Sequence, residues 1–315
     1  MKRVLSTIVK LSVSAGLLYY LLMRSDLEVL ARVVADASGQ FLVVAVLFFV
    51  LSNALGALQW HLLLKAQQLP IRFGQSLIFY WLGVFFNNVL LGNIGGDALR
   101  IYDIRRLTGE GTGGAAATFM DRFIGLFSTC SLALVAYLLV AEVRAAKLVM
   151  VLFPIWLALV VLLCMGLSRH VGWFLERQAQ RFLPERVTRL LHDLRLSIVV
   201  YRHRIGLLLC LWVVSLGVQA SRILVYWMAG LSVGITTSAM FYVAFQPIAA
   251  IIAALPISIG GLGIRENVLV ELFGSVGTPE RLAFAMSLLG YGAGIVASLL
   301  GGVAFVLRHV ERTEE

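Results

Sequence analysis

The chain has 315 residues, of which 60% are hydrophobic and only 14% charged, and its mean hydropathy is +0.91. A soluble protein of this size cannot bury so much apolar surface, so the composition excludes a soluble enzyme, a disordered chain and a secreted disulfide scaffold. The net charge of +9 lies in loops between apolar runs, which is typical of an integral membrane protein and not of a nucleic-acid-binding surface.

Six apolar runs are long enough to cross a membrane as helices, which takes about 20 residues. We expect the first of them to be an uncleaved span rather than a signal peptide, because no small-residue cleavage site closes it. In chain order the six runs are Val4–Met23, Phe41–Leu64, Gly114–Val140, Lys147–Leu167, Ile205–Gly230 and Arg281–Leu307.

Two further apolar runs are interrupted by small residues at what would be membrane depth. They are Gly74–Leu91, followed by GNIGGD, and Ile235–Leu255, followed by PISIGGLGIREN. The distribution of Lys and Arg puts both chain termini and both ends of the first run in the cytoplasm, and it makes the second run enter and return from outside. The sequence therefore predicts an all-α polytopic membrane protein with about six transmembrane helices and two re-entrant helical hairpins. Eight transmembrane helices are the alternative.

Basic residues also dominate the stretch 169–204, which holds eight Arg against three acids. We expect it to lie in the cytoplasm as amphipathic helices along the anionic leaflet.

The two broken runs carry the same motif 165 residues apart. Ile94-Gly95-Gly96-x-x-x-Arg100 matches Ile259-Gly260-Gly261-x-x-x-Arg265, and the same offset superimposes two pairs of expected spans. We therefore expect a single transmembrane domain made of two repeats, about 1–140 and about 147–307, in opposite orientations. Inverted repeats with helices broken near mid-membrane are typical of alternating-access transporters.

The glycines at each break have two candidate roles. Gly95, Gly96, Gly260 and Gly261 let the chain turn and let a ligand approach the backbone, and the helix that follows presents free N–H groups to an anion such as a lipid phosphate. Close packing of helices is the alternative role.

Polar side chains next to the breaks are candidate substrate-binding residues because polar groups inside a membrane need partners. Neighbouring residues do not face each other on a helix, so we expect Asp121 and Arg122 each to pair elsewhere, Asp121 with Arg100 or Arg265. A central Arg222 costs about 2.5–3.5 kcal/mol on insertion scales, so it either binds a head group or extends to the interface. The remaining candidates are Asn87, Asn88, Asp97 and Glu266.

Motifs for ATP binding and metal binding are missing from the sequence, and the three cysteines lie inside apolar runs without C-x-x-C spacing. We therefore expect no cofactor, no metal site and no enzymatic activity.

Three segments, FFNNVLLGNIGGDALRIYDIRR, MDRFIGL and LPISIGGLGIRENVLVELF, resemble the lysylphosphatidylglycerol synthase transmembrane-domain family, the flippase-like membrane family. The resemblance covers essentially the whole chain. It is a resemblance to the flippase part of the multiple peptide resistance factor, the part that moves aminoacylated lipid between leaflets. The synthase half of that factor is absent here.

The resemblance implies an inner-membrane translocase for a lipid with an anionic or phosphate-containing head group, such as a phospholipid, a polyprenyl-phosphate lipid or a glycolipid. It also implies that the charged candidates above bind the substrate. The alternatives are a membrane-embedded lipid-modifying transferase and an accessory membrane partner of a glycosyltransferase. Candidate partners are a glycosyltransferase, a lipid synthase and a second copy of the chain.

Overall fold

The computed structural model describes residues 27–89, 95–139, 149–167, 199–202, 204–254, 258 and 261–313. Their regular structure is entirely helical, and the chain is an all-α polytopic membrane protein, as the sequence predicts. The expected first span Val4–Met23, nearly all of the basic stretch 169–204, and Gly260 lie outside the described residues.

Four of the described helices are long and apolar enough to cross a membrane: α3 (Gly39–Ala66), α6 (Gly111–Leu139), α11 (Ile205–Ser232) and α14 (Glu280–Thr313). They coincide with four of the expected spans. At about 1.5 Å per residue each exceeds the roughly 30 Å hydrocarbon layer, so they can cross it with a tilt. A fifth apolar helix, α8 (Val149–Leu167), coincides with the expected span Lys147–Leu167.

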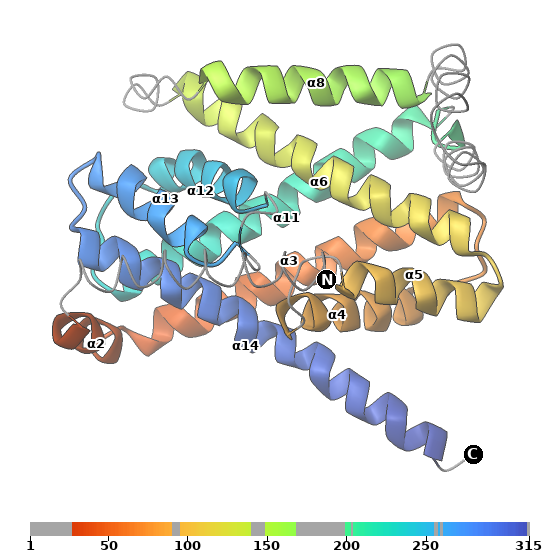
Figure 1. Ribbon diagram of the computed structural model, residues 1–315, viewed down its shortest axis with the longest axis horizontal. Coiled ribbons are helices and arrows are strands. Elements are labelled where there is room, and N and C mark those ends of the chain that lie inside the picture. Colours follow the sequence, from red (N-terminus) through yellow and green to blue (C-terminus); the bar gives the residue numbers. More distant parts are fainter. Residues whose placement is uncertain are drawn as a thin grey trace, which may run out of the picture.

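Each interrupted run forms two short helices. The first run gives α4 (Phe73–Val89) and α5 (Gly95–Thr108), and the second gives α12 (Ala239–Ala253) and α13 (Ile264–Gly274). At about 1.5 Å per residue, none of the four is long enough to span the roughly 30 Å hydrocarbon layer alone. Figure 1 shows the α4–α5 pair toward one end of the long axis and the α12–α13 pair toward the other.

The helix contacts of the first half recur in the second. Helix α3 packs against α4 as α11 packs against α12, and α5 packs against α6 as α13 packs against α14. Between the halves, α4 packs on α14 while α12 packs on α6, and the most extensive contact joins α3 to α11. Each short helix pair therefore rests on the last long helix of the other half.

Glycines at equivalent positions of the two motifs allow each helix pair to close. A Cβ on Gly96 would clash with the carbonyl group of Gly83 on α4. A Cβ on Gly261, whose φ is +76°, would lie 2.7 Å from the Cβ of Ala253 on α12. Close packing, the alternative role considered for these residues, is thus what both glycines do in the structure.

A short helix precedes α3 at a place where no span is expected. Helix α2 (Leu27–Ala35) buries Leu30 in the core formed with α6 and α11 to α14, and Val33 packs against that core. The spacing of these apolar residues places them on one face, which explains why the segment is helical.

Candidate functional site

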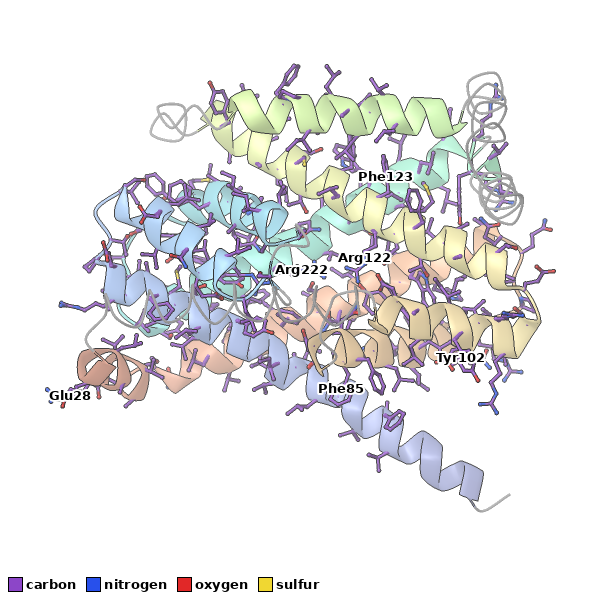
Figure 2. The ribbon with its side chains drawn as sticks, in the orientation of Figure 1. Glu28, Phe85, Tyr102, Arg122, Phe123 and Arg222 are labelled. Carbon is purple, nitrogen blue, oxygen red and sulfur yellow. The ribbon has the colours of Figure 1, made fainter. Side chains whose placement is uncertain are left out.

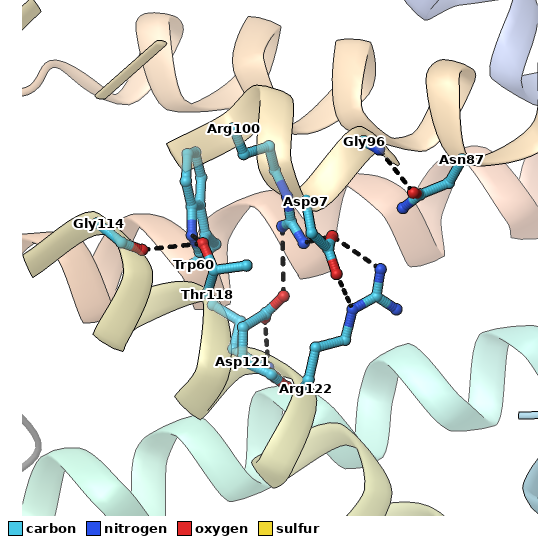
Figure 3. Close-up of polar contacts among 10 residues, drawn as sticks. Trp60, Asn87, Gly96, Asp97, Arg100, Gly114, Thr118, Asp121 and Arg122 are labelled. Atoms are coloured by element: carbon cyan, nitrogen blue, oxygen red, sulfur yellow. Dashed lines mark hydrogen bonds and ion pairs between the residues drawn. The ribbon is translucent and has the colours of Figure 1, made fainter. Parts of the chain in front are cut away.

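Four charged side chains form a network between α5 and α6 (Figure 3). The Arg100 guanidinium donates to Asp97 Oδ1 at 2.5 Å and to Asp121 Oδ2 at 3.3 Å, and its side chain is only 3% exposed. The Arg122 guanidinium binds Asp97 through two nitrogens, Nε at 2.8 Å and Nη2 at 2.9 Å. The predicted pairing of Asp121 with Arg100 is confirmed, and the partner of Arg122 is Asp97.

Aromatic rings and an amide hold Arg100 and Asp121 in place. The guanidinium carbon of Arg100 lies 5.2 Å from the centre of the Trp60 ring and 4.8 Å from that of Tyr80. Gln59 donates to Asp121 Oδ1 at 2.8 Å. These contacts from α3 and α4 hold the network in place, while Arg100 Nε and Gln59 Oε1 are buried without a hydrogen-bond partner among the described residues.

Sequence reasoning missed Gln59, Trp60 and Tyr80. An amide inside an apolar span, as at Gln59, is the signal that could have identified one of them. The two rings carry no such signal, because aromatic residues are common in any buried helix.

Charge is balanced within this network but not beside it. Two arginines and two aspartates cancel at neutral pH. Arg222, in the middle of α11, donates from Nε to the buried hydroxyl of Ser52 on α3 at 3.2 Å, and no acid among the described residues lies within ion-pair distance of it. This hydrogen bond holds the Arg222 side chain against α3 rather than extended to the end of its helix.

Arg222 lies within electrostatic range of Arg122 and Asp121 on α6 and of Arg265 on α13. Figure 2 shows Arg122 and Arg222 near the centre of the view, on the neighbouring helices α6 and α11. The Arg122 side chain is 51% exposed even though it holds Asp97, so it lines an accessible space. We call Arg122, Arg222 and Arg265 the arginine cluster.

The second helix pair holds its charges in another way. Arg265 stacks on the ring of Tyr291 of α14, with 5.1 Å from the guanidinium carbon to the ring centre. Glu266 is completely buried, and its Oε2 accepts a hydrogen bond from the backbone N–H of Gly263 at 2.6 Å. Its Oε1 has no partner among the described residues. Glu266 therefore caps α13 through Oε2.

Backbone N–H groups at the two breaks are less available than the sequence predicts. Asn87 accepts the N–H of Gly96 at 2.8 Å, and Glu266 accepts that of Gly263. Asn87 therefore belongs to the site as a cap of α5, whereas Asn88 is exposed and contacts none of the charged groups described here. Gly95 begins α5. An anion near these helix ends would meet arginine side chains before it meets free backbone N–H groups.

Metal binding finds no support in the described residues, which contain no group of three or more His, Cys, Asp or Glu side chains able to hold an ion.

Comparison with known proteins places these features in a family. The model of the lysylphosphatidylglycerol synthase TM region matches residues 7–302. A UPF0104 membrane protein of Pyrococcus horikoshii is 24% identical over 320 residues, which cover 92% of this chain and 94% of that protein. A UPF0104 membrane protein of Methanothermobacter thermautotrophicus is 24% identical over 305 residues, covering 86% of this chain and 84% of that protein.

Proposed function

The chain belongs to the lysylphosphatidylglycerol synthase TM-region family, and from that premise we propose that it is a lipid translocase. It moves a lipid with an anionic or phosphate-containing head group between the leaflets of the cytoplasmic membrane, without hydrolysing ATP and without changing the lipid covalently. Both chain termini face the cytoplasm in this proposal, as the distribution of Lys and Arg favours.

The observation that carries the proposal is the environment of Arg222. A charged side chain in the middle of a transmembrane helix is costly, and such residues mark substrate pathways when no counter-ion is present. The described residues offer Arg222 one hydroxyl, from Ser52, and no carboxylate within ion-pair distance; the charge of Asp121 acts on it only from farther away. A phosphate group supplies the missing negative charge in a geometry that a guanidinium binds through two nitrogens.

Arg122 on α6 also supports the binding of an anionic head group. Its Nε and Nη2 are bound to Asp97, whereas its Nη1 has no partner among the described residues. Asp97 orients the Arg122 guanidinium, and the unused donor is available to a ligand. Four arginines and three acids, Glu266 included, leave one net positive charge for the whole site.

The arrangement of helices supports an alternating-access route. Each helix pair packs on the last long helix of the other half, so the contacts of one half are mirrored by those of the other. Inverted repeats with binding at the junction of broken helices work by rocking one repeat against the other. In this proposal α4–α5 is re-entrant from the cytoplasm and α12–α13 from outside.

Transfer of lipid in proteoliposomes tests the proposal. The purified chain is reconstituted, without nucleotide, in vesicles that carry a trace of fluorescent phosphatidylglycerol or fluorescent phosphatidylcholine. Dithionite then bleaches the probe in the outer leaflet. We expect protein-dependent access to the inner-leaflet phosphatidylglycerol and much less to phosphatidylcholine. Equal rates for both lipids, or no transfer, would contradict the proposal.

Recovery of the lipid after the assay separates transport from catalysis. Thin-layer chromatography should show the labelled phosphatidylglycerol unchanged. A new labelled product formed by the purified chain would favour the transferase alternative instead.

A further inference from the structure

A cavity of about 350 Å³ lies between α6, α8 and α11, separate from the charged network. Phe123 and Phe127 line it from α6, Trp156 from α8, and Leu208, Leu209 and Trp212 from α11. On α6 and α11 these residues recur every three or four positions, so each helix contributes one face to the cavity. Helix α8 covers the cavity by packing on α6.

Stacked aromatic side chains form the walls of the cavity. The ring of Phe127 stacks on Trp156 with centres 5.7 Å apart and an interplanar angle of 22°, and it contacts Trp212 with centres 6.4 Å apart. Such contacts between large rings stabilise their orientation. The walls are therefore formed before any ligand binds.

Polar atoms in the walls are not available to a ligand. Ser131 accepts a hydrogen bond from Trp156 Nε1 at 3.0 Å and donates to the Phe127 carbonyl at 2.8 Å. The indole nitrogen of Trp212 is buried and does not reach the cavity surface. A ligand finds only apolar surface here, which suits a hydrocarbon chain and disfavours a polar head group.

The cavity and the arginine cluster share helix α6. Phe123 directly follows Arg122 on α6, and Figure 2 shows the two on different sides of that helix, with Phe123 toward α8. Beyond Trp212 on α11, Gln219 donates to the carbonyl of Gly125 at 3.1 Å, which brings α6 and α11 together at this level. The two sites are therefore separated by one helix diameter, roughly 10–12 Å, a distance that a lipid bound at Arg122 by its head group can span with one of its chains.

We infer that this cavity binds one hydrocarbon chain of the lipid whose anionic head group the arginine cluster holds. The inference rests on the proposed function, because it takes the head group as bound at Arg122 and Arg222. It adds that the protein recognises its substrate at two places and that one chain of the lipid leaves the bulk bilayer during binding. A charged site and an apolar cavity within reach of one lipid molecule favour this occupant over bulk lipid without a matching charge.

Photolabelling in nanodiscs tests the inference with the full chain. The nanodiscs contain phosphatidylcholine and a trace of phosphatidylglycerol that carries a diazirine in one acyl chain. After irradiation, mass spectrometry of peptides should locate adducts on the segments of α6, α8 and α11 that line the cavity. Unlabelled phosphatidylglycerol should reduce these adducts at roughly tenfold lower concentration than unlabelled phosphatidylcholine.

Two matched variants are compared. One fills the cavity, and the other enlarges a side chain on an unrelated lipid-facing surface. Leu209 lines the cavity and is 57% exposed, and Leu299 on α14 is 52% exposed. Leu209→Trp should reduce the cavity adducts by roughly tenfold, because the added ring displaces the chain, whereas Leu299→Trp should leave them unchanged. The competition experiment on the unmodified chain needs no variant, so a folding defect in Leu209→Trp cannot hide the answer.

Each outcome is decisive. Adducts that are spread over all lipid-facing helices, or that both unlabelled lipids displace equally, would mean that the cavity holds only bulk lipid and would overturn the inference. If phosphatidylglycerol is transferred in proteoliposomes but does not label the cavity selectively, the inference fails and the proposed function stands. If the cavity is labelled selectively but no transfer occurs, the chain site stands and the translocase proposal fails.

Discussion

Two regions of this protein treat their arginines in opposite ways. In the first helix pair, Arg100 is almost completely buried, pairs with Asp97 and Asp121, and lies between two aromatic rings. In the middle of α11, Arg222 has a serine hydroxyl as its hydrogen-bond partner and no carboxylate within ion-pair distance among the described residues. The same residue type is therefore neutralised in one region and left charged in the other.

This difference separates structural charge from functional charge. A buried ion pair whose members satisfy each other gives a ligand no net attraction, but losing one member is costly because the other remains buried and charged. An arginine without a counter-ion destabilises the empty protein and is retained where it binds something. Arg100 should therefore matter mainly for folding, and Arg222 mainly for function.

Removing Arg100 should have the largest effect on stability. Arg100→Met leaves Asp121 buried without its ion pair, so the free energy of unfolding should fall by about 3–5 kcal/mol. Unfolding in a denaturing detergent titration measures the change. Arg106→Met, at an exposed position of the same helix, is the matched control and should shift stability by at most about 0.5 kcal/mol. Equal stability of the two variants would show that the network is not structural.

Adding a methyl group at the hinge of the first helix pair should have the next largest effect. Gly96→Ala forces a Cβ against the Gly83 carbonyl and should cost about 1–3 kcal/mol. Gly74→Ala, on α4 and with no atom within 4 Å of the added Cβ, should be neutral. A stable Gly96→Ala protein would show that α4 and α5 are not closely packed there.

Arg222→Gln sharpens the comparison because it separates stability from activity. The free energy of unfolding should stay unchanged or rise by about 1 kcal/mol, since an unpaired charge is removed from the interior. Transfer of phosphatidylglycerol in proteoliposomes should be lost. Arg106→Gln should retain both stability and transfer. Full transfer by Arg222→Gln would exclude a role for this side chain in binding the head group.

Ser52→Ala should have the smallest effect. It removes the hydrogen bond to Arg222 Nε but not the charge, so stability should change by about 0.5–1.5 kcal/mol and transfer should be slowed rather than lost. Initial rates in the dithionite assay measure the difference. Complete loss of transfer would mean that Ser52 itself contacts the substrate.

Much of the fold follows from the sequence because long apolar runs in a membrane can only form helices. The runs Phe41–Leu64, Gly114–Val140, Ile205–Gly230 and Arg281–Leu307 correspond to α3, α6, α11 and α14. The helicity of α2 was not predicted, because a helix of 9 residues is too short to be recognised as a membrane span.

The candidate site was predicted less completely. The pairing of Arg100 with Asp121 could be anticipated from charge and mid-membrane position, but its aromatic neighbours depend on how α3 and α4 pack, which no local pattern records. The cap that Glu266 makes was not predicted, although three residues separate it from Gly263, a spacing that brings a carboxylate back to its own helix end. Opposite orientation of the two halves stays a prediction, supported by their matching contacts.

Native mass spectrometry of retained lipid tests the central claim most directly, namely that an uncompensated arginine inside the membrane holds the anionic head group. The chain and its Arg222→Gln variant are extracted gently from the same membranes, and the bound lipids are identified and counted. We predict that phosphate lipids with net negative charge dominate on the unmodified chain and that the variant loses them selectively while keeping zwitterionic lipid. The same anionic lipids, retained in equal amounts by both proteins, would contradict the claim.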